Sequence, residues 1–114
     1  MTETDVRVID GVTVVAPTGP LDVSTAVEFR DLLAGPVSGS GNRVLVDLTN
    51  VTLVDSSGVG VFVTAHRQAE AAGAEFALAG AVGPVGRVFE MTRTNKLLHI
   101  HETVEEALAS LRSR

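Results

Sequence analysis

The sequence contains no cysteine, tryptophan or tyrosine and only four phenylalanines. Without cysteine, the chain can form no disulfide, no thiolate zinc site and no cysteine nucleophile. With so few aromatic side chains, it offers little surface on which sugars or bases could stack. These absences direct attention to the hydroxyl and carboxylate side chains as the carriers of any function.

Basic residues are also few: nine Lys and Arg stand against fourteen Asp and Glu, which gives a net charge of −5. They are scattered along the chain, whereas DNA or RNA binding requires a concentrated basic surface. No apolar run approaches the ~20 residues of a membrane span, and the acidic segment Met1–Asp5 lacks the basic start of a secretory signal. We therefore expect a cytoplasmic protein that neither binds nucleic acid nor inserts into a membrane.

The 114 residues, 45% of them hydrophobic, suffice for one core and one domain spanning residues 1–114. The most linker-like stretch, Val37–Asn42, is short enough to be a loop within that domain. No exposed apolar stripe is evident in the sequence that would demand a homodimer.

Alternating strand and helix patterns predict an α/β fold. Two β-branched runs, Val6–Ile9 and Val12–Ala16, flank Asp10-Gly11, which is typical of a hairpin with a type I′ turn. A helical period follows from Thr25 to Leu33, where Thr25 and Glu28 match a capping box. The nearly continuous apolar run Arg43–Thr49 predicts a strand covered by helices on both faces.

Further along, the chain turns from the end of a strand at 51–54 directly into a second helix, which Gly73 is well placed to end. The elements predicted after it are a strand at Glu75–Ala79, a helix opened by Pro84, a strand at Leu97–His101 and a terminal helix with a second capping box, Thr103 with Glu106. The order β-β-α-β-α-β-α-β-α predicts a mainly parallel sheet, made mixed by the first hairpin, with about four helices.

The most informative stretch is Leu53–Val61, where a strand ends and a helix begins. Asp55, Ser56 and Ser57 all favour helix capping, and capping alone would account for them. A functional interpretation is also open, because unpaired N–H groups and the helix dipole at such a terminus favour an anion. A phosphate on Ser56 would add roughly −1.5 to −2 charges there without unfolding the domain.

This stretch is also where the sequence resembles a known family. The motif Asp55-Ser-Ser-Gly-Val-Gly60 is similar to that of the STAS family, specifically the bacterial anti-sigma factor antagonists. The chain departs from the family's pattern at Met91-Thr-Arg-Thr94, where Met-Thr-Gly-Leu is expected. The other matching segments, which extend the resemblance over essentially the whole chain, are Thr18–Asp22, Val44–Leu48, Ala69–Gly73, Arg87–Thr92 and Lys96–Ile100.

The resemblance implies a STAS fold and a partner-switching protein that is neither an enzyme nor a cofactor carrier. Its partners would be an anti-sigma factor that is also a serine kinase, and a PP2C-type phosphatase, in the control of stress response or sporulation. The phosphoacceptor would be Ser56. The partner-binding residues that the resemblance implies are Asp22, Asp55, Ser57, Gly58, Val59 and Gly60.

Two other functions compete with this one. A hydrolase or transferase could use Ser56 or Ser57 as nucleophile, but the chain has no Gly-x-Ser-x-Gly elbow and no histidine in a segment predicted to reach them. The nearer rival keeps the fold and changes the role to a STAS-type scaffold, or to a cytoplasmic subunit of a membrane transporter or sensory complex.

The remaining polar candidates have simpler interpretations. His99 and His101 have the spacing of a metal pair but no third ligand, so we expect surface histidines and no metal site. His66 shares its helix face with apolar residues and is expected to be partly buried. Asp47, inside an apolar strand, is expected to be paired or bonded to the backbone.

Overall fold

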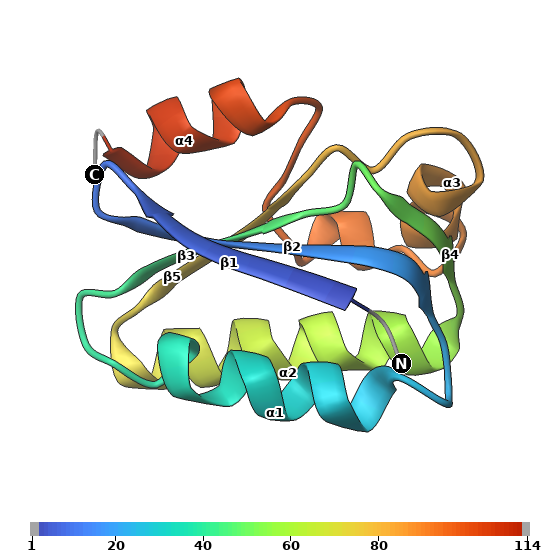
Figure 1. The fold of residues 1–114 in the computed structure, drawn as a ribbon, viewed down its shortest axis with the longest axis horizontal. Coiled ribbons are helices and arrows are strands. Elements are labelled where there is room, and N and C mark those ends of the chain that lie inside the picture. The colour runs from blue at the N-terminus through green and yellow to red at the C-terminus, as the bar shows by residue number, and fades with distance from the viewer. Residues whose placement is uncertain (1–2, 113–114) are drawn as a thin grey trace.

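The computed structural model describes residues 3–112, which form one mixed sheet flanked by helices (Figure 1). In chain order, the elements are β1 (Glu3–Ile9), β2 (Val12–Leu21), α1 (Ala26–Val37), β3 (Arg43–Asp47), β4 (Val51–Val54), α2 (Ser56–Ala72), β5 (Glu75–Ala79), α3 (Gly83–Met91), a 3₁₀ turn (Thr94–Lys96), β6 (Ile100–His101) and α4 (Val104–Arg112).

Within the described residues, the sheet has six strands in the order β1-β2-β3-β5-β6, with β4 paired to the end of β2. The β1–β2 pair is antiparallel and the other pairs are parallel. Helices α1 and α2 cover one face of the sheet and α4 the other, while α3 lies beyond β4 at one end (Figure 1). The mixed sheet and the helices predicted from the sequence are thus confirmed.

The first hairpin has the predicted turn. Asp10 and Gly11 both have positive φ, at 51° and 79°, and Ile9 pairs with Val12 across them. A type I′ turn requires these two left-handed residues, and its twist matches that of the strands it joins. The second strand runs beyond its predicted end at Ala16 as far as Leu21, because β4 pairs with its last residues.

The predicted strand at 43–49 is confirmed except for its last two residues. It ends at Asp47, whose Oδ1 accepts a hydrogen bond from the Thr49 backbone N–H at 3.0 Å. This local bond turns the chain, as short polar side chains commonly do. Residues 51–54 then form a separate strand, and the expectation that Asp47 bonds to the backbone is confirmed.

The first capping box is also wrong. Thr25 holds the N-cap position, but its hydroxyl makes no capping bond. Instead it donates to the Pro20 carbonyl at 3.0 Å and accepts from the Asp22 N–H at 3.1 Å. The helix itself runs past its predicted end to Val37, with Pro36 in its last turn.

In the second predicted capping box, near the C-terminal end of the chain, the structure shows the hydrogen bond to the threonine hydroxyl. The Glu106 N–H donates to Thr103 Oγ1 at 3.1 Å, as an N-cap threonine predicts. The last strand is shorter than predicted, because residues 94–96 form a 3₁₀ turn and pairing begins only at Ile100. Gly73 ends α2 in the left-handed conformation, with φ of 76°, as predicted.

Three phenylalanine rings in a row connect α1, α2 and α3. The Phe29 and Phe62 rings, from α1 and α2, pack edge to face at a centroid distance of 5.9 Å. The rings of Phe62 and Phe89, from α3, lie at the same distance. Aromatic pairs of this kind contribute beyond the area they bury, so Phe62 packs the N-terminal half of α2 against both neighbouring helices.

Candidate functional site

The candidate site lies where two neighbouring parallel strands end. Leu21 closes β2 and pairs with Val54, which closes β4. The next residues, Asp22 and Asp55, therefore leave the sheet at the same edge, and the Asp55 N–H donates to the Leu21 carbonyl at 3.2 Å. Ligand and docking sites commonly form at this edge of an α/β sheet, beyond the carboxyl ends of the strands.

Asp55 caps helix α2. Its backbone is extended, and its Oδ1 accepts hydrogen bonds from the Ser57 N–H at 2.8 Å and the Gly58 N–H at 3.2 Å. The carboxylate thus satisfies two of the four N–H groups that a helix leaves unpaired at its start. The predicted capping role is confirmed for Asp55 and leaves the next residue, Ser56, outside the cap.

Ser56 is the first residue of α2 and is exposed. Its hydroxyl makes no hydrogen bond with any residue that the structure describes. A serine in this position can be reached by a modifying enzyme without local unfolding. It also lies at the positive end of the helix dipole, where a phosphate is favoured.

Asp22 is held by the turn that precedes α1. Its Oδ1 accepts from the Ser24 hydroxyl at 2.6 Å and from the Ser24 N–H at 2.9 Å. These two bonds, the hydroxyl first, lower the pKa of the Asp22 carboxyl below its ordinary value of 3.8. Sequence reasoning missed Ser24, although an Asp-x-Ser turn is a recognisable local signal.

The predicted partner-binding residues differ in exposure. Gly60 is exposed, and Asp22, Asp55 and Ser57 are partly exposed, so all four can touch a docked protein. Gly58 and Val59 are buried. Gly58 and Val59 therefore pack beneath the exposed surface of the site and not on it.

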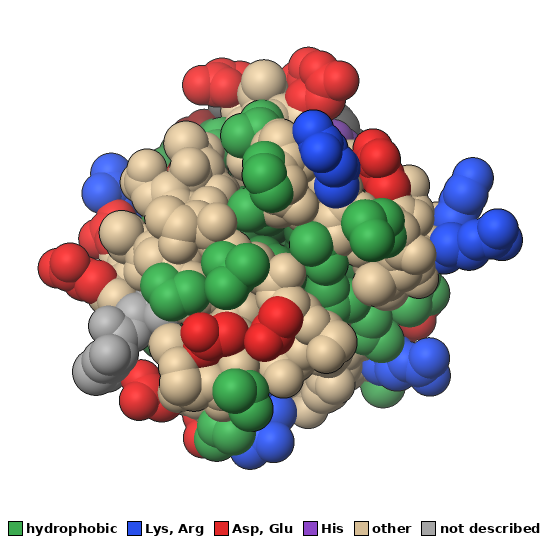
Figure 2. Space-filling view, turned by 90° about the vertical axis from the view of Figure 1, so that its right-hand side faces the viewer, with side chains coloured by type: hydrophobic (Ala, Val, Ile, Leu, Met, Phe, Trp, Pro, Cys, Tyr) green, Lys and Arg blue, Asp and Glu red, His purple; other side chains and the backbone are tan. Residues whose placement is uncertain are grey.

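Hydrophobic side chains surround the two carboxylates. Val23, in the turn after Asp22, is 76% exposed, and Leu53 of β4 and Val27 of α1 are more than half exposed. Figure 2 shows this end of the molecule, where acidic side chains near the middle have hydrophobic side chains around them and Lys and Arg toward the periphery. Exposed apolar residues rimmed by polar ones mark protein interaction sites.

A shallow groove continues this surface between α1 and α2. Its volume is about 270 Å³. Ser57 and Gly60 line it from α2, and Val27 and Arg30 from α1. The groove extends the exposed surface from the strand ends along the two helices.

The histidines lie elsewhere. His66, predicted to be partly buried, is buried in α2, with Nε2 at 3.3 Å from Glu70 Oε1. The His99 ring lies beside that of His66, at a centroid distance of 5.9 Å. His99 precedes β6, so it does not lie in the same strand as His101, contrary to the predicted strand at 97–101. Among the residues that the structure describes, no group of three or more side chains is arranged to hold a metal ion.

The fold and this edge of the sheet define a small α/β domain whose exposed serine opens a helix beside two carboxylates. Residues 3–107 match the family model of the STAS domain, so the chain belongs to the STAS family. The anti-sigma-B factor antagonist of Staphylococcus aureus is 35% identical over 88 residues, which cover 76% of this chain and 81% of that protein.

Solved structures share the fold. An anti-sigma factor antagonist from Mycobacterium paratuberculosis superposes with a TM-score of 0.87 at 23% identity, over 98% of this chain and 95% of that one. The antagonist SpoIIAA in its unphosphorylated form gives 0.76 at 20% identity, over 100% and 98%. The murine anion transporter Slc26a9 gives 0.74 at 18% identity, over 95% of this chain and 19% of that one.

Within the described residues, no helix is both long enough and apolar enough to cross a membrane.

Proposed function

We propose that this chain is an anti-sigma factor antagonist whose binding is controlled by phosphorylation of Ser56. The observation that carries the proposal is the exposed Ser56 hydroxyl at the first position of α2, at the edge where two paired strands end and each is followed by an aspartate. The name of the Staphylococcus aureus relative supports the antagonist role. The chain then supplies a substrate serine and a docking surface, and its partners supply the chemistry.

The partner is an anti-sigma factor with serine kinase activity, which binds the unmodified form and thereby releases a sigma factor. The kinase transfers the γ-phosphoryl group of ATP to Ser56 Oγ, with loss of the hydroxyl proton and release of ADP. A PP2C-type phosphatase returns the serine by adding water and releasing inorganic phosphate. These reactions take place in the cytoplasm, where ATP and the sigma factor are found.

The switch acts through charge. A phosphate on Ser56 adds a dianion beside Asp22 and Asp55, at a surface that also carries the exposed side chains of Val23, Val27 and Leu53. A partner pressed against this surface would have to desolvate the dianion and face its repulsion. A penalty of about 3 kcal/mol would weaken binding roughly a hundredfold.

A scaffold or transporter-subunit role is the second candidate. The fold likeness to the murine anion transporter covers 95% of this chain, so the fold alone admits this role. An exposed serine free of hydrogen bonds within the described structure is needed by a phosphorylation switch and not by a scaffold. This difference favours the antagonist.

The first test is an intact-mass measurement on the protein isolated from its own cells, with peptide mapping. We expect a fraction heavier by one phosphate, located on Ser56. Affinity capture with Ser56→Ala should then retain an ATPase of the histidine-kinase class, and capture of a transporter ATPase would favour the second candidate.

Binding of the identified kinase to three variants completes the test. Ser56→Ala should bind as tightly as the unmodified protein, and Ser56→Asp about tenfold to a hundredfold more weakly. Ser57→Ala, which removes the neighbouring hydroxyl, is the matched control and should remain phosphorylatable. Equal binding by the alanine and aspartate variants at position 56 would refute the switch.

A further inference from the structure

The outer edge of β1 is a second surface with unpaired binding groups, distinct from the Ser56 site. Among the described strands, β1 pairs with β2 alone. Two of its side chains, Val6 and Val8, are 50% and 71% exposed. Exposed valines on an edge strand are unusual, because such edges are prone to pair with another chain.

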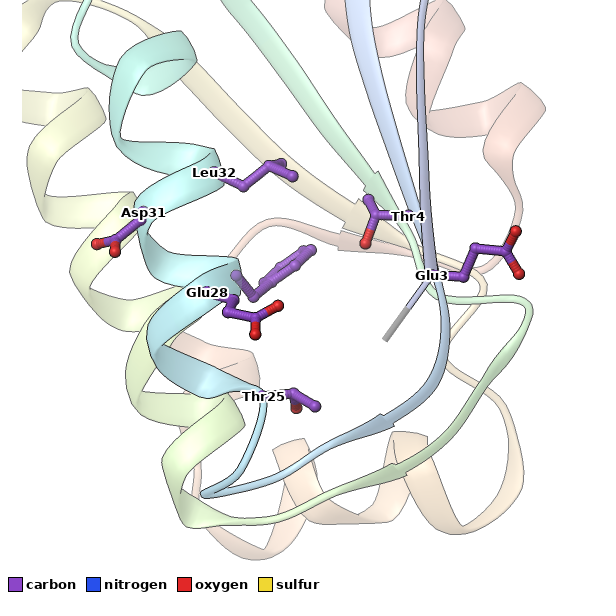
Figure 3. Close-up of a pocket in the computed structure, with 7 residues that line it drawn as sticks. Glu3, Thr4, Thr25, Glu28, Asp31 and Leu32 are labelled. Atoms are coloured by element: carbon purple, nitrogen blue, oxygen red, sulfur yellow. The ribbon is translucent and has the colours of Figure 1, made fainter. Parts of the chain in front are cut away.

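Val6 and Val8 are exposed because, among the described elements, no helix packs closely on β1. A groove of about 670 Å³ separates the N-terminal part of β1 from α1. Figure 3 shows Thr4 of β1 and Leu32 of α1 pointing toward one another across it, with Glu28 also directed inward. Thr4, Val6 and Val8 alternate along the strand, so the three side chains share this uncovered face.

The hairpin turn determines which backbone groups of β1 are available. A type I′ turn bonds the Ile9 carbonyl to the Val12 N–H, so Ile9 faces β2. In an antiparallel pair, residues alternate between bonding the neighbouring strand and pointing away from it. The N–H and C=O groups of Thr4, Val6 and Val8 therefore point outward, ready to bond a further strand.

The charged side chains on the other face of β1 indicate which strand would pair with this edge. Asp5 and Arg7 form an ion pair within the strand, with Arg7 Nη2 at 2.6 Å from Asp5 Oδ2, and both side chains are more than half exposed. If a second β1 lies antiparallel with its Val6 opposite this Val6, each Asp5 faces the partner's Arg7. Cross-strand neighbours of opposite charge stabilise a sheet, and like charges destabilise it.

Alternative registers are less favourable. If the two strands were centred on Asp5 or on Arg7 instead of Val6, Asp5 would lie opposite Asp5, or Arg7 opposite Arg7. If they were centred on Thr4 or on Val8, Asp5 would lie opposite Glu3, or Arg7 opposite Ile9. The register centred on Val6 is thus the one that sets Asp5 opposite Arg7, and it also aligns the valine rows.

We propose that a second copy of this chain pairs antiparallel with the outer edge of β1, about a two-fold axis at Val6, to form a homodimer. The valines of both copies form one apolar row on the face beside the groove, and Val8 of each copy lies opposite Thr4 of the other. The Asp5 and Arg7 side chains set the register, since exposed ion pairs add specificity more than affinity. The Ser56 sites lie outside the contact and point in opposite directions.

A single-strand contact is smaller than a standard interface of about 1,600 Å², so we expect a weak dimer, with a Kd on the order of 100 µM. Sedimentation velocity up to about 1 mM protein, with NMR shift mapping over the same range, measures it. Concentration-dependent shifts should concentrate in residues 4–8. A monomer at the highest concentration, or shifts confined to another surface, would overturn the proposal.

Charge reversal tests the register. Asp5→Arg and Arg7→Asp should each weaken dimerisation at least tenfold, because each sets like charges opposite one another. The double variant Asp5→Arg/Arg7→Asp restores opposite charges and should dimerise like the original chain. Failure of the double variant to recover, with its circular dichroism unchanged, would contradict the proposed register.

Proline substitution tests the edge. The Val6 N–H points outward, so Val6→Pro removes a bond to the second copy while the bonds to β2 remain. We expect it to be folded and monomeric, whereas Arg7→Pro, whose N–H faces β2, should destabilise the hairpin itself. Dimerisation of Val6→Pro as strong as that of the original chain would rule out pairing through this edge. Neither result depends on the phosphorylation of Ser56.

Discussion

Gly58 lies so close to Leu21 that a β-carbon on Gly58 would stand 2.6 Å from the Leu21 carbonyl oxygen. The same atom would approach Val54 Cγ1 to 3.1 Å. The first turn of α2 is therefore packed directly onto the last residues of β2 and β4. This close approach holds Ser56 at the strand ends, beside Asp22, and explains why a glycine follows the two serines.

The first prediction concerns this contact. Gly58→Ala should lower the free energy of unfolding by about 1–3 kcal/mol, because the backbone that the new methyl meets cannot move aside easily. Urea denaturation followed by circular dichroism measures the loss. Gly60→Ala is the matched control: a β-carbon there meets nothing within 4 Å. In a helix that change should stabilise by about 0.5–1 kcal/mol. Equal stability of the two variants would disprove the close contact.

The second prediction concerns the helix cap. Asp55→Ala removes the acceptor of the Ser57 and Gly58 N–H groups and should cost about 1 kcal/mol of stability. Asp55→Asn retains an oxygen acceptor and should lose only a few tenths of that figure. Thermal and urea unfolding of the two variants distinguish capping from charge. If asparagine were as destabilising as alanine, the negative charge and not the hydrogen bonds would be essential.

The third prediction concerns the titration of Asp22. The Ser24 hydroxyl and N–H stabilise the ionised carboxylate, so the pKa of Asp22 lies below 3.8 in the folded protein. Ser24→Ala should raise that pKa toward 3.8, since the largest of its causes is removed. An NMR titration of the side-chain carboxyl carbons measures the midpoint. An unchanged midpoint would show that the serine hydroxyl does not bond the carboxylate in solution.

The same pKa shift predicts a pH dependence of stability. A carboxyl whose pKa is lower in the folded state stabilises the protein above its unfolded pKa, and this contribution is lost as the pH falls through the folded value. The original chain should therefore exceed Ser24→Ala in stability at about pH 6, and by less at about pH 2. Urea unfolding at both pH values measures the difference, with Ser38→Ala as an exposed-serine control.

Features that local hydrogen bonds and backbone conformations determine were predicted from local patterns in the sequence. The Asp10-Gly11 turn and the end of α2 at Gly73 follow from backbone conformations that few residues adopt. The motif from Asp55 to Gly60 located the candidate site, because a capping residue acts on the amides directly after it.

Features that depend on how the chain folds around a motif, and not on the motif alone, were not predictable in the same way. Thr25 resembles a capping residue, but its hydroxyl bonds to Pro20 and Asp22 across the preceding turn. Gly58 was expected at the docking surface, and only the packing of α2 on β2 shows it to be buried. The exposure of Val8 likewise depends on where α1 lies, which no pattern within β1 reveals.

The last prediction concerns Arg93, which occupies a left-handed conformation with φ of 60° and ψ of 13°. Its N–H donates to the Glu90 carbonyl at 3.1 Å, and its own carbonyl accepts from the Lys96 N–H at 3.1 Å, so both neighbouring turns hold it there. An L-residue in this region is strained by roughly 1–2 kcal/mol relative to glycine.

Arg93→Gly should therefore raise the free energy of unfolding by about 1 kcal/mol, since relief of strain exceeds the added flexibility of the unfolded chain. Arg93→Ala removes the same charge but keeps the strain, so it should give no such gain. Asp10→Gly, at the other left-handed residue, should change stability little, because aspartate tolerates this conformation. Urea unfolding of the three variants decides the matter: a gain shared by the alanine variant would assign the effect to the lost charge, and a gain confined to Arg93→Gly assigns it to the backbone.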